Sequence, residues 1–428
     1  TGVQTCALPI YLITGSVNQI KNKRIHKGGI KMSMKKFTKK MLAIVAAVAM
    51  TMGMAMPAFA ADPSSAQDTK NNAKEAYIKK TYNTEVKKEM TFTFAATQVK
   101  DASRDDLVKT DLTCDIPNIK FEAADLNSGA GTYTKLSDTA ITFGTLEEAG
   151  KYEYTVTESA TTNPVVTNND YEKLIMSQAE YKMDVYVVEK SGKLEIDKIL
   201  VTKTKNDKGD PDTETGKVDI GKNDSNGFNF TNTYVQEAGT GETPDPTDPD
   251  PNYTENGALK VSKTIDAQGE TPSDSASFSF TAKFVFPEGT DAATLGGVKG
   301  NGADVSLTGG TYEFNLKHGQ NMKFTGLPVG TKITVTETGA ANYKASASFV
   351  LNGGTATTRA AGKYHEDLTV VTDGKLGQKT NTVDVTNTYN YVPTTGIIMN
   401  TLPYVLMVAL CAAALFGFVA FKRKKVQK

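Results

Sequence analysis

The chain has 428 residues, too many for one compact domain and enough for two or three. Its formal net charge is zero, but the charges are unevenly distributed. Residues 1–60 carry 9 Lys and Arg, residues 396–428 carry 5, and neither segment has an acidic residue. Residues 61–395 therefore hold 34 basic and all 48 acidic side chains, a net charge of −14. This negative charge argues against nucleic acid as a partner and suits an exposed extracellular surface.

Residues 32–60 have the three parts of a secretory signal: lysines, an apolar run and the small-x-small cleavage site Ala58-Phe59-Ala60. The sequence therefore predicts cleavage between Ala60 and Ala61. An uncleaved membrane anchor is the alternative, which the shortness of the apolar run disfavours. Residues 1–31 precede this signal, and we interpret them as translated noncoding sequence.

Residues 61–235 alternate apolar and polar side chains in short runs, for example at 91–94, 152–156 and 181–187. Clusters of Gly, Asn, Asp and Pro separate these runs, as they separate strands in a sheet. Residues 236–256 are dominated by Pro, Asp and Thr and have no apolar period. This composition predicts a stiff, acidic, extended linker.

Residues 257–391 again alternate, at 259–265, 277–280 and 333–336, and no helical period of useful length occurs in either half. Such patterning is typical of antiparallel β-sandwiches. The predicted fold is therefore all-β: two tandem immunoglobulin-like antiparallel β-sandwich domains, with a signal peptide before them and a transmembrane sorting helix after them.

The C-terminal segment, 392–428, begins with Val392-Pro393-Thr394-Thr395-Gly396. A mostly apolar stretch follows at 397–421, long enough to span a bilayer, and the basic cluster 422–425 would hold its end on the cytoplasmic side. The pentapeptide resembles the sortase sorting motif LPxTG, with Val392 replacing Leu. The resemblance implies that a sortase cysteine attacks the amide between Thr395 and Gly396.

The two halves of the body repeat one another. YTVTES (154–159) matches ITVTETG (333–339), FTNTY (230–234) matches VTNTY (385–389), and IKKTY (78–82) matches VSKTI (261–265). Each half thus has a lysine strand, a glutamate strand and an asparagine strand in the same order.

Alternation places Lys263 on the apolar face of its strand, with Leu259, Val261 and Ile265. Lys80 has the same parity in the first half, with Lys79 as the alternative that parity disfavours. A lysine on a core face is costly unless it is neutralised or paired.

Parity also turns Glu158, Glu337, Asn232 and Asn387 inward on their own strands. Burial disfavours both charged forms, lowering a lysine pKa and raising a glutamate pKa. A neutral amine is a nucleophile, and a protonated carboxyl can donate to the asparagine carbonyl while ammonia leaves. The pattern therefore predicts self-formed Lys–Asn amide bonds.

Nothing else in the body could staple it. Of the three cysteines only Cys114 lies between the signal and the C-terminal apolar run, so no intrachain disulfide is available. The three histidines show no metal-ligand spacing, and we predict neither a metal nor a cofactor.

With these motifs the chain resembles streptococcal pilus backbone subunits of the T-antigen type, whose Cna B-type domains carry intramolecular isopeptide bonds. The resemblance covers nearly all of residues 62–428. It implies a Lys80–Asn232 bond assisted by Glu158 and a Lys263–Asn387 bond assisted by Glu337.

The resemblance also implies that the chain is a sortase-assembled pilus subunit. Its partners would be sortase, related pilin subunits and peptidoglycan. The membrane would hold the chain transiently, and the mature protein would lie outside the cell, attached to the wall. Sortase would join Thr395 to a lysine of the next subunit, for which Lys217 and Lys222 are the candidates. A wall-anchored adhesin or minor pilin that binds a host-surface ligand is the alternative. No enzyme motif is present, so we predict a substrate of sortase rather than an enzyme.

Overall fold

A computed structural model describes residues 69–100, 108–126, 131–213, 216–390 and 394–425. The predicted upstream segment 1–31, the signal segment 32–60 with the Ala60–Ala61 cleavage site, and Val392 and Pro393 of the sorting motif lie outside the described residues. These predictions stay untested.

In the first half, the regular elements among the described residues are all strands. Their bounds are β1 (Lys79–Asn83), β2 (Met90–Phe92), β3 (Phe94–Gln98), β4 (Val108–Lys109), β5 (Cys114–Asp115), β6 (Ile119–Phe121), β7 (Thr132–Leu136), β8 (Thr142–Phe143), β9 (Gly150–Glu158), β10 (Glu172–Ile175), β11 (Glu180–Lys190), β12 (Lys193–Lys205) and β13 (Asn229–Gln236).

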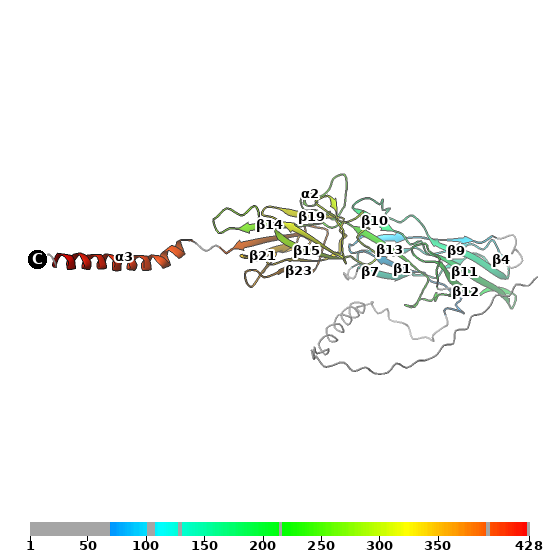
Figure 1. Cartoon of the computed structure of the whole chain (residues 1–428). Coiled ribbons are helices and arrows are strands. Elements are labelled where there is room, and N and C mark those ends of the chain that lie inside the picture. The colour runs from blue at the N-terminus through cyan, green and yellow to red at the C-terminus, as the bar shows by residue number, and fades with distance from the viewer. Residues whose placement is uncertain (1–68, 101–107, 127–130, 214–215, 391–393, 426–428) are drawn as a thin grey trace, which may run out of the picture. The chain divides into compact units, whose positions relative to one another are not determined.

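Two sheets face each other across the core of this half. One has the order β10-β13-β1-β7 and the other the order β12-β11-β9-β3, with β4 added beside β9. Figure 1 shows β1, β7 and β13 together in this half of the chain. Large aromatic and aliphatic side chains from both sheets fill the space between them, so this half is a β-sandwich.

The second half has a short helix and then strands. The bounds are α2 (Pro251–Asn256), β14 (Leu259–Asp266), β15 (Phe278–Val285), β16 (Lys299–Gly300), β17 (Ala303–Asp304), β18 (Thr311–Leu316), β19 (Asn321–Thr325), β20 (Lys332–Glu337), β21 (Tyr343–Val350), β22 (Thr357–Ala360), β23 (Leu368–Lys375) and β24 (Thr382–Tyr389).

These strands also form two facing sheets, β17-β16-β19-β14-β24-β21-β22 and β18-β15-β20-β23, with a separate apolar core between them. The all-β fold with two tandem sandwiches is thus confirmed. Most strand pairs are antiparallel, as predicted, but the first and last strands of each sandwich, β1 with β13 and β14 with β24, pair in parallel.

The predicted strand runs coincide with observed strands, with one exception. The run at 91–94 is broken at Thr93: β2 ends at Phe92 and pairs with β6, whereas β3 begins at Phe94 and pairs with β9. The chain therefore passes from one pairing partner to another at this point, which an unbroken alternation does not signal.

The stretch predicted to be an extended linker, 236–256, is partly packed. Glu237, Ala238 and Thr240 are buried, and the backbone N–H of Ala238 donates to the carbonyl of Leu327 at 2.9 Å. The stretch ends in α2, whose first turn is capped by Asp250. The composition of this stretch predicted an extended linker and no helix. The expectation of an extended segment is therefore wrong for these two parts.

The C-terminal part forms the helix α3 (Thr394–Lys425), the coiled ribbon marked near the C-terminus in Figure 1. Among the residues that the structure describes, no helix is both long and apolar enough to cross a membrane. The membrane-spanning role of residues 397–421 stays a prediction.

Candidate functional site

The lysine strand of the first sandwich, β1, lies between β13 and β7 in the middle of its sheet. Its alternation turns Lys80 into the core, where the residue is 0% exposed. Lys79 points the other way and donates from Nζ to the carbonyl of Asp224 at 3.2 Å. The structure therefore places Lys80, and not its neighbour, in the core.

Glu158 is the last residue of β9, on the sheet that faces β1, and its side chain is fully buried. Its Oε1 atom accepts from Lys80 Nζ at 2.6 Å and from Asn232 Nδ2 at 3.0 Å. The three predicted residues of the first half thus meet at one carboxylate oxygen, and Asn232 is itself 0% exposed.

The second sandwich repeats this arrangement. Lys263 Nζ lies 3.2 Å and 2.9 Å from the two carboxylate oxygens of Glu337, the last residue of β20. Asn387 Nδ2 donates to Glu337 Oε1 at 2.5 Å. All three side chains are buried.

The strand register explains why the two sites are alike. On the parallel strand pair, Tyr82 lies opposite Asn232 and Ile265 lies opposite Asn387, so each asparagine is paired with the residue two positions after the lysine. Side chains two positions apart share one face of a sheet. Lysine and asparagine are therefore neighbours on adjacent strands, and the glutamate reaches them from the opposite sheet.

An aromatic ring accompanies each lysine, a feature that the sequence analysis did not predict. Lys80 Nζ lies 4.3 Å from the ring centroid of Phe92, and Lys263 Nζ lies 4.3 Å from that of Phe278. The ring excludes water from one side of the amine. A sequence signal for these rings is the Phe-x-Phe pattern at 92–94 and again at 278–280, where alternation places both phenylalanines on the inward face.

Burial dominates the electrostatics of both sites. It lowers the pKa of Lys80 to about 8 and that of Lys263 to about 8, although the neighbouring glutamate opposes the shift in each case. Burial likewise raises the pKa of Glu158 and of Glu337, against the lysine charge. The amine is thereby brought closer to its neutral form and the carboxyl closer to its protonated form.

This geometry is suited to an acyl transfer assisted by proton transfers through the glutamate. If the lysine gives its proton to the glutamate, a neutral amine is left beside the asparagine amide. Attack of Nζ on Cγ forms the new C–N bond, the C–Nδ2 bond breaks, and Nδ2 takes the proton and leaves as ammonia. Nζ sheds a second proton as it becomes the amide nitrogen, and this proton goes to the glutamate, which ends protonated; the carboxyl thus acts as a proton shuttle.

The orientation of the asparagine differs from the sequence-based expectation. We expected the carboxyl to donate to the asparagine carbonyl, but in both sites the glutamate faces Nδ2. Asn232 Oδ1 instead accepts from the backbone N–H of Ser177 at 2.7 Å, and Asn387 Oδ1 is buried without a hydrogen-bond partner among the described residues. The glutamate is therefore placed to protonate the leaving nitrogen.

The other predicted site residues lie outside these triads. Lys217 and Lys222 are exposed; the first lies 3.4 Å from Asn71 Oδ1, and the second donates to the carbonyl of Asp138 at 2.8 Å. Thr394, Thr395 and Gly396 form the first turn of α3.

Cys114 is half-buried, and burial raises the pKa of its thiol to about 12. The thiolate is therefore disfavoured, and no chemistry at this residue is indicated.

Residues 257–389 match the model of a protein family described as a domain of unknown function (DUF7601). No curated protein matches the chain. Among solved structures, the chain is similar to the major pilin from Streptococcus pyogenes, with 19% identity, 74% of this chain and 99% of that chain covered, and a TM-score of 0.29.

A second similar structure is the major pilin protein T3.2 from Streptococcus pyogenes, with 16% identity, 74% and 99% coverage and a TM-score of 0.26. A third is a pilus-presented adhesin, with 16% identity, 49% and 36% coverage and a TM-score of 0.23. Because every TM-score is below 0.5, the function must be inferred from the residues of this chain.

Proposed function

We propose that the chain is a structural subunit of a sortase-assembled pilus, most simply its repeating shaft protein. In this proposal each sandwich is stapled by a self-formed amide bond, Lys80–Asn232 in the first and Lys263–Asn387 in the second. Sortase cuts after Thr395 and joins successive subunits on the outside of the cell. The chain is a substrate of sortase and turns over only its own side chains.

The observation that carries the proposal is the pair of buried triads with the same geometry. A buried ion pair with an asparagine on the same oxygen could serve packing alone, but such pairs give little net stability over an apolar core. Two independent copies at the same register, each with a lowered lysine pKa, are better explained by a shared reaction.

The position of the bonds supports a load-bearing role. Each would connect the first and last strands of its sandwich, which are adjacent and parallel. A subunit pulled from both ends transmits force through these two strands. A covalent link between them would carry the load that no disulfide in the body can carry, because Cys114 is its single cysteine.

The direct test is the intact mass of a recombinant chain comprising residues 61–391. Two bonds lower the mass by two ammonia molecules, and peptide mapping should recover Lys80 joined to Asn232 and Lys263 joined to Asn387. A chain with its full calculated mass would refute the covalent part of the proposal, and the reading as a single anchored adhesin would then be preferred.

Glu158→Gln and Glu337→Gln serve as matched variants, since each alters one site and leaves the other intact. Each should restore one ammonia mass and no more. Each should also lower the unfolding free energy of its own sandwich by about 5 kcal/mol, the chain-entropy value for a link that closes a loop of more than 100 residues.

A further inference from the structure

The two bond-forming sites differ at the asparagine oxygen. Ser177 follows β10, and its backbone N–H donates to Asn232 Oδ1 at 2.7 Å. Ser177 is buried, so water does not compete for this contact. In the second site Asn387 Oδ1 is buried and has no hydrogen-bond partner in the part of the chain that the structure describes.

This contact matters because of where charge develops. When Lys80 Nζ attacks Cγ of Asn232, the electrons of the C=O bond move onto Oδ1. A donor already aimed at that oxygen stabilises the resulting oxyanion without reorganising. The Ser177 N–H occupies the place of such a donor, while Glu158 on the other side of the amide faces Nδ2.

A second loop fixes Ser177. Asp207 lies in the turn after β12, and its Oδ1 accepts from Ser177 Oγ at 2.6 Å and from the backbone N–H of Thr231 at 2.8 Å. Its backbone carbonyl also accepts from the N–H of Gln178 at 3.0 Å. Asp207 thus ties the loop that carries the donor to Thr231, the residue next to Asn232.

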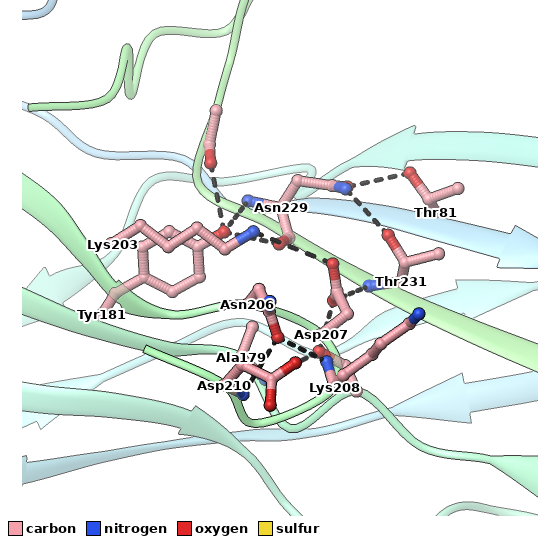
Figure 2. Close-up of polar contacts among 12 residues, drawn as sticks. Thr81, Ala179, Tyr181, Lys203, Asn206, Asp207, Lys208, Asp210, Asn229 and Thr231 are labelled. Atoms are coloured by element: carbon pink, nitrogen blue, oxygen red, sulfur yellow. Dashed lines mark hydrogen bonds and ion pairs between the residues drawn. The ribbon is translucent and has the colours of Figure 1, made fainter. Parts of the chain in front are cut away.

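The turn around Asp207 is itself well held. Figure 2 shows Asp207 bonded to Thr231 and near Lys203, with Asn206 at the centre of the turn. Asn206 Oδ1 accepts from the backbone N–H groups of Lys208 and Asp210 at 2.9 Å and 3.1 Å. The carboxylate is therefore presented on a braced turn rather than on a free loop.

We propose that the backbone N–H of Ser177 is the oxyanion donor of the first bond-forming site and that Asp207 is the positioning residue that aims it. The inference rests on the proposed Lys80–Asn232 bond. It assigns the faster reaction to the first sandwich, since no described residue donates to the equivalent oxygen in the second.

The experiment follows both bonds in the full chain made by a short pulse of cell-free translation, with samples quenched over time and the joined peptides quantified. Asp207→Ala should slow formation of the first bond by about tenfold or more and leave the second bond unchanged. Asp207→Asn keeps an acceptor oxygen and should restore most of the rate. Asp210→Ala removes a carboxylate from the same turn and should behave as the wild type.

Ser177→Ala is the second variant, because it keeps the donating N–H but loses the hydrogen bond to Asp207. Formation of the first bond should slow by a smaller factor, and Ser177→Thr should reverse this slowing.

Melting temperatures of Asp207→Ala in a Glu158→Gln background, where the first bond cannot form, measure any purely structural effect. Wild-type rates for Asp207→Ala, or equal slowing of both bonds, would overturn the inference and leave the proposed bonds standing. Absence of both bonds from the wild type would instead refute the proposed function.

Discussion

A buried lysine and glutamate that touch share one proton, and this decides how their reaction depends on pH. The ion pair and the neutral pair of Lys80 and Glu158 contain the same number of protons. Transfer of the proton from amine to carboxyl is therefore internal, and it does not require the pH to approach the lysine pKa. The same holds for Lys263 and Glu337.

We predict a plateau in the rate of bond formation around neutral pH, with a decline on both sides. Above about pH 8 the lysine loses its proton to solvent, because burial lowers its pKa to about 8, and the carboxyl then starts the reaction without the proton that it would donate to Nδ2. At acid pH the carboxyl is protonated while the amine keeps its own proton, so no nucleophile is present. Burial raises the pKa of each glutamate and therefore moves this lower limit to higher pH.

The measurement is the time course of ammonia loss in pulse-translated chains that are transferred to buffers of different pH. A rate that climbs steadily above pH 8 would contradict the internal transfer, since it would mean that a free amine alone suffices. Glu158→Gln, with its first site inactive, provides the baseline for the second site.

At the residue scale, parity alone predicted the inward positions of both lysines, both glutamates and both asparagines. The period of two is a property of the strand itself, so a single sequence contains it. Ser177 and Asp207 were not predicted, because they lie in loops with no period and meet Asn232 only through the tertiary fold. The orientation of the asparagine amides also depends on such neighbours.

At the scale of elements, most strands were predictable and their pairing was not. Alternation identified β9, β11, β14 and β20, but a parallel pair between the first and last strand of a sandwich leaves no local trace. The predictions of an unbroken strand at 91–94 and of an extended linker at 236–256 were wrong for a related reason. In both places, contacts with distant parts of the chain outweigh the local sequence pattern.

The parallel pairing leads to a mechanical prediction. If Lys80 is joined to Asn232, a force on the two ends of the sandwich is transmitted through this bond. The residues between Lys80 and Asn232 carry no force and cannot extend. In single-molecule pulling, the wild-type body should therefore show no unfolding step from either sandwich. Glu158→Gln should release about 500 Å of chain in one step, and Glu337→Gln about 400 Å, at the extended length per residue.

Each variant is the other's control in this experiment, since only the altered sandwich should extend. An unfolding step of full length in the wild type would show that the first and last strands are not covalently joined. A step in both sandwiches of a single variant would show that the two staples are not independent.

For the whole molecule, the proposed assembly depends on features outside the two cores with their proposed bonds. The proposed polymer needs a cut after Thr395 and an accessible lysine on the next subunit, and Lys217 and Lys222 are both exposed. The sequence motif predicts the cut, whereas neither lysine is distinguished from the many other surface lysines by its contacts. Which amine reacts must therefore be found by substitution.

We expect wall extracts of cells that make the chain together with a sortase to give a ladder of high-mass bands on denaturing gels, because the joints between subunits are covalent. Thr395→Ala should abolish the ladder by removing the acyl donor. Lys217→Arg or Lys222→Arg should abolish the ladder only if that residue supplies the acceptor amine, since arginine keeps the charge but is not the nucleophile.

The double variant Glu158→Gln with Glu337→Gln should retain the ladder, because the internal bonds would stabilise each subunit rather than join it to the next. A single band in the wild type would contradict the shaft assignment and favour an anchored adhesin.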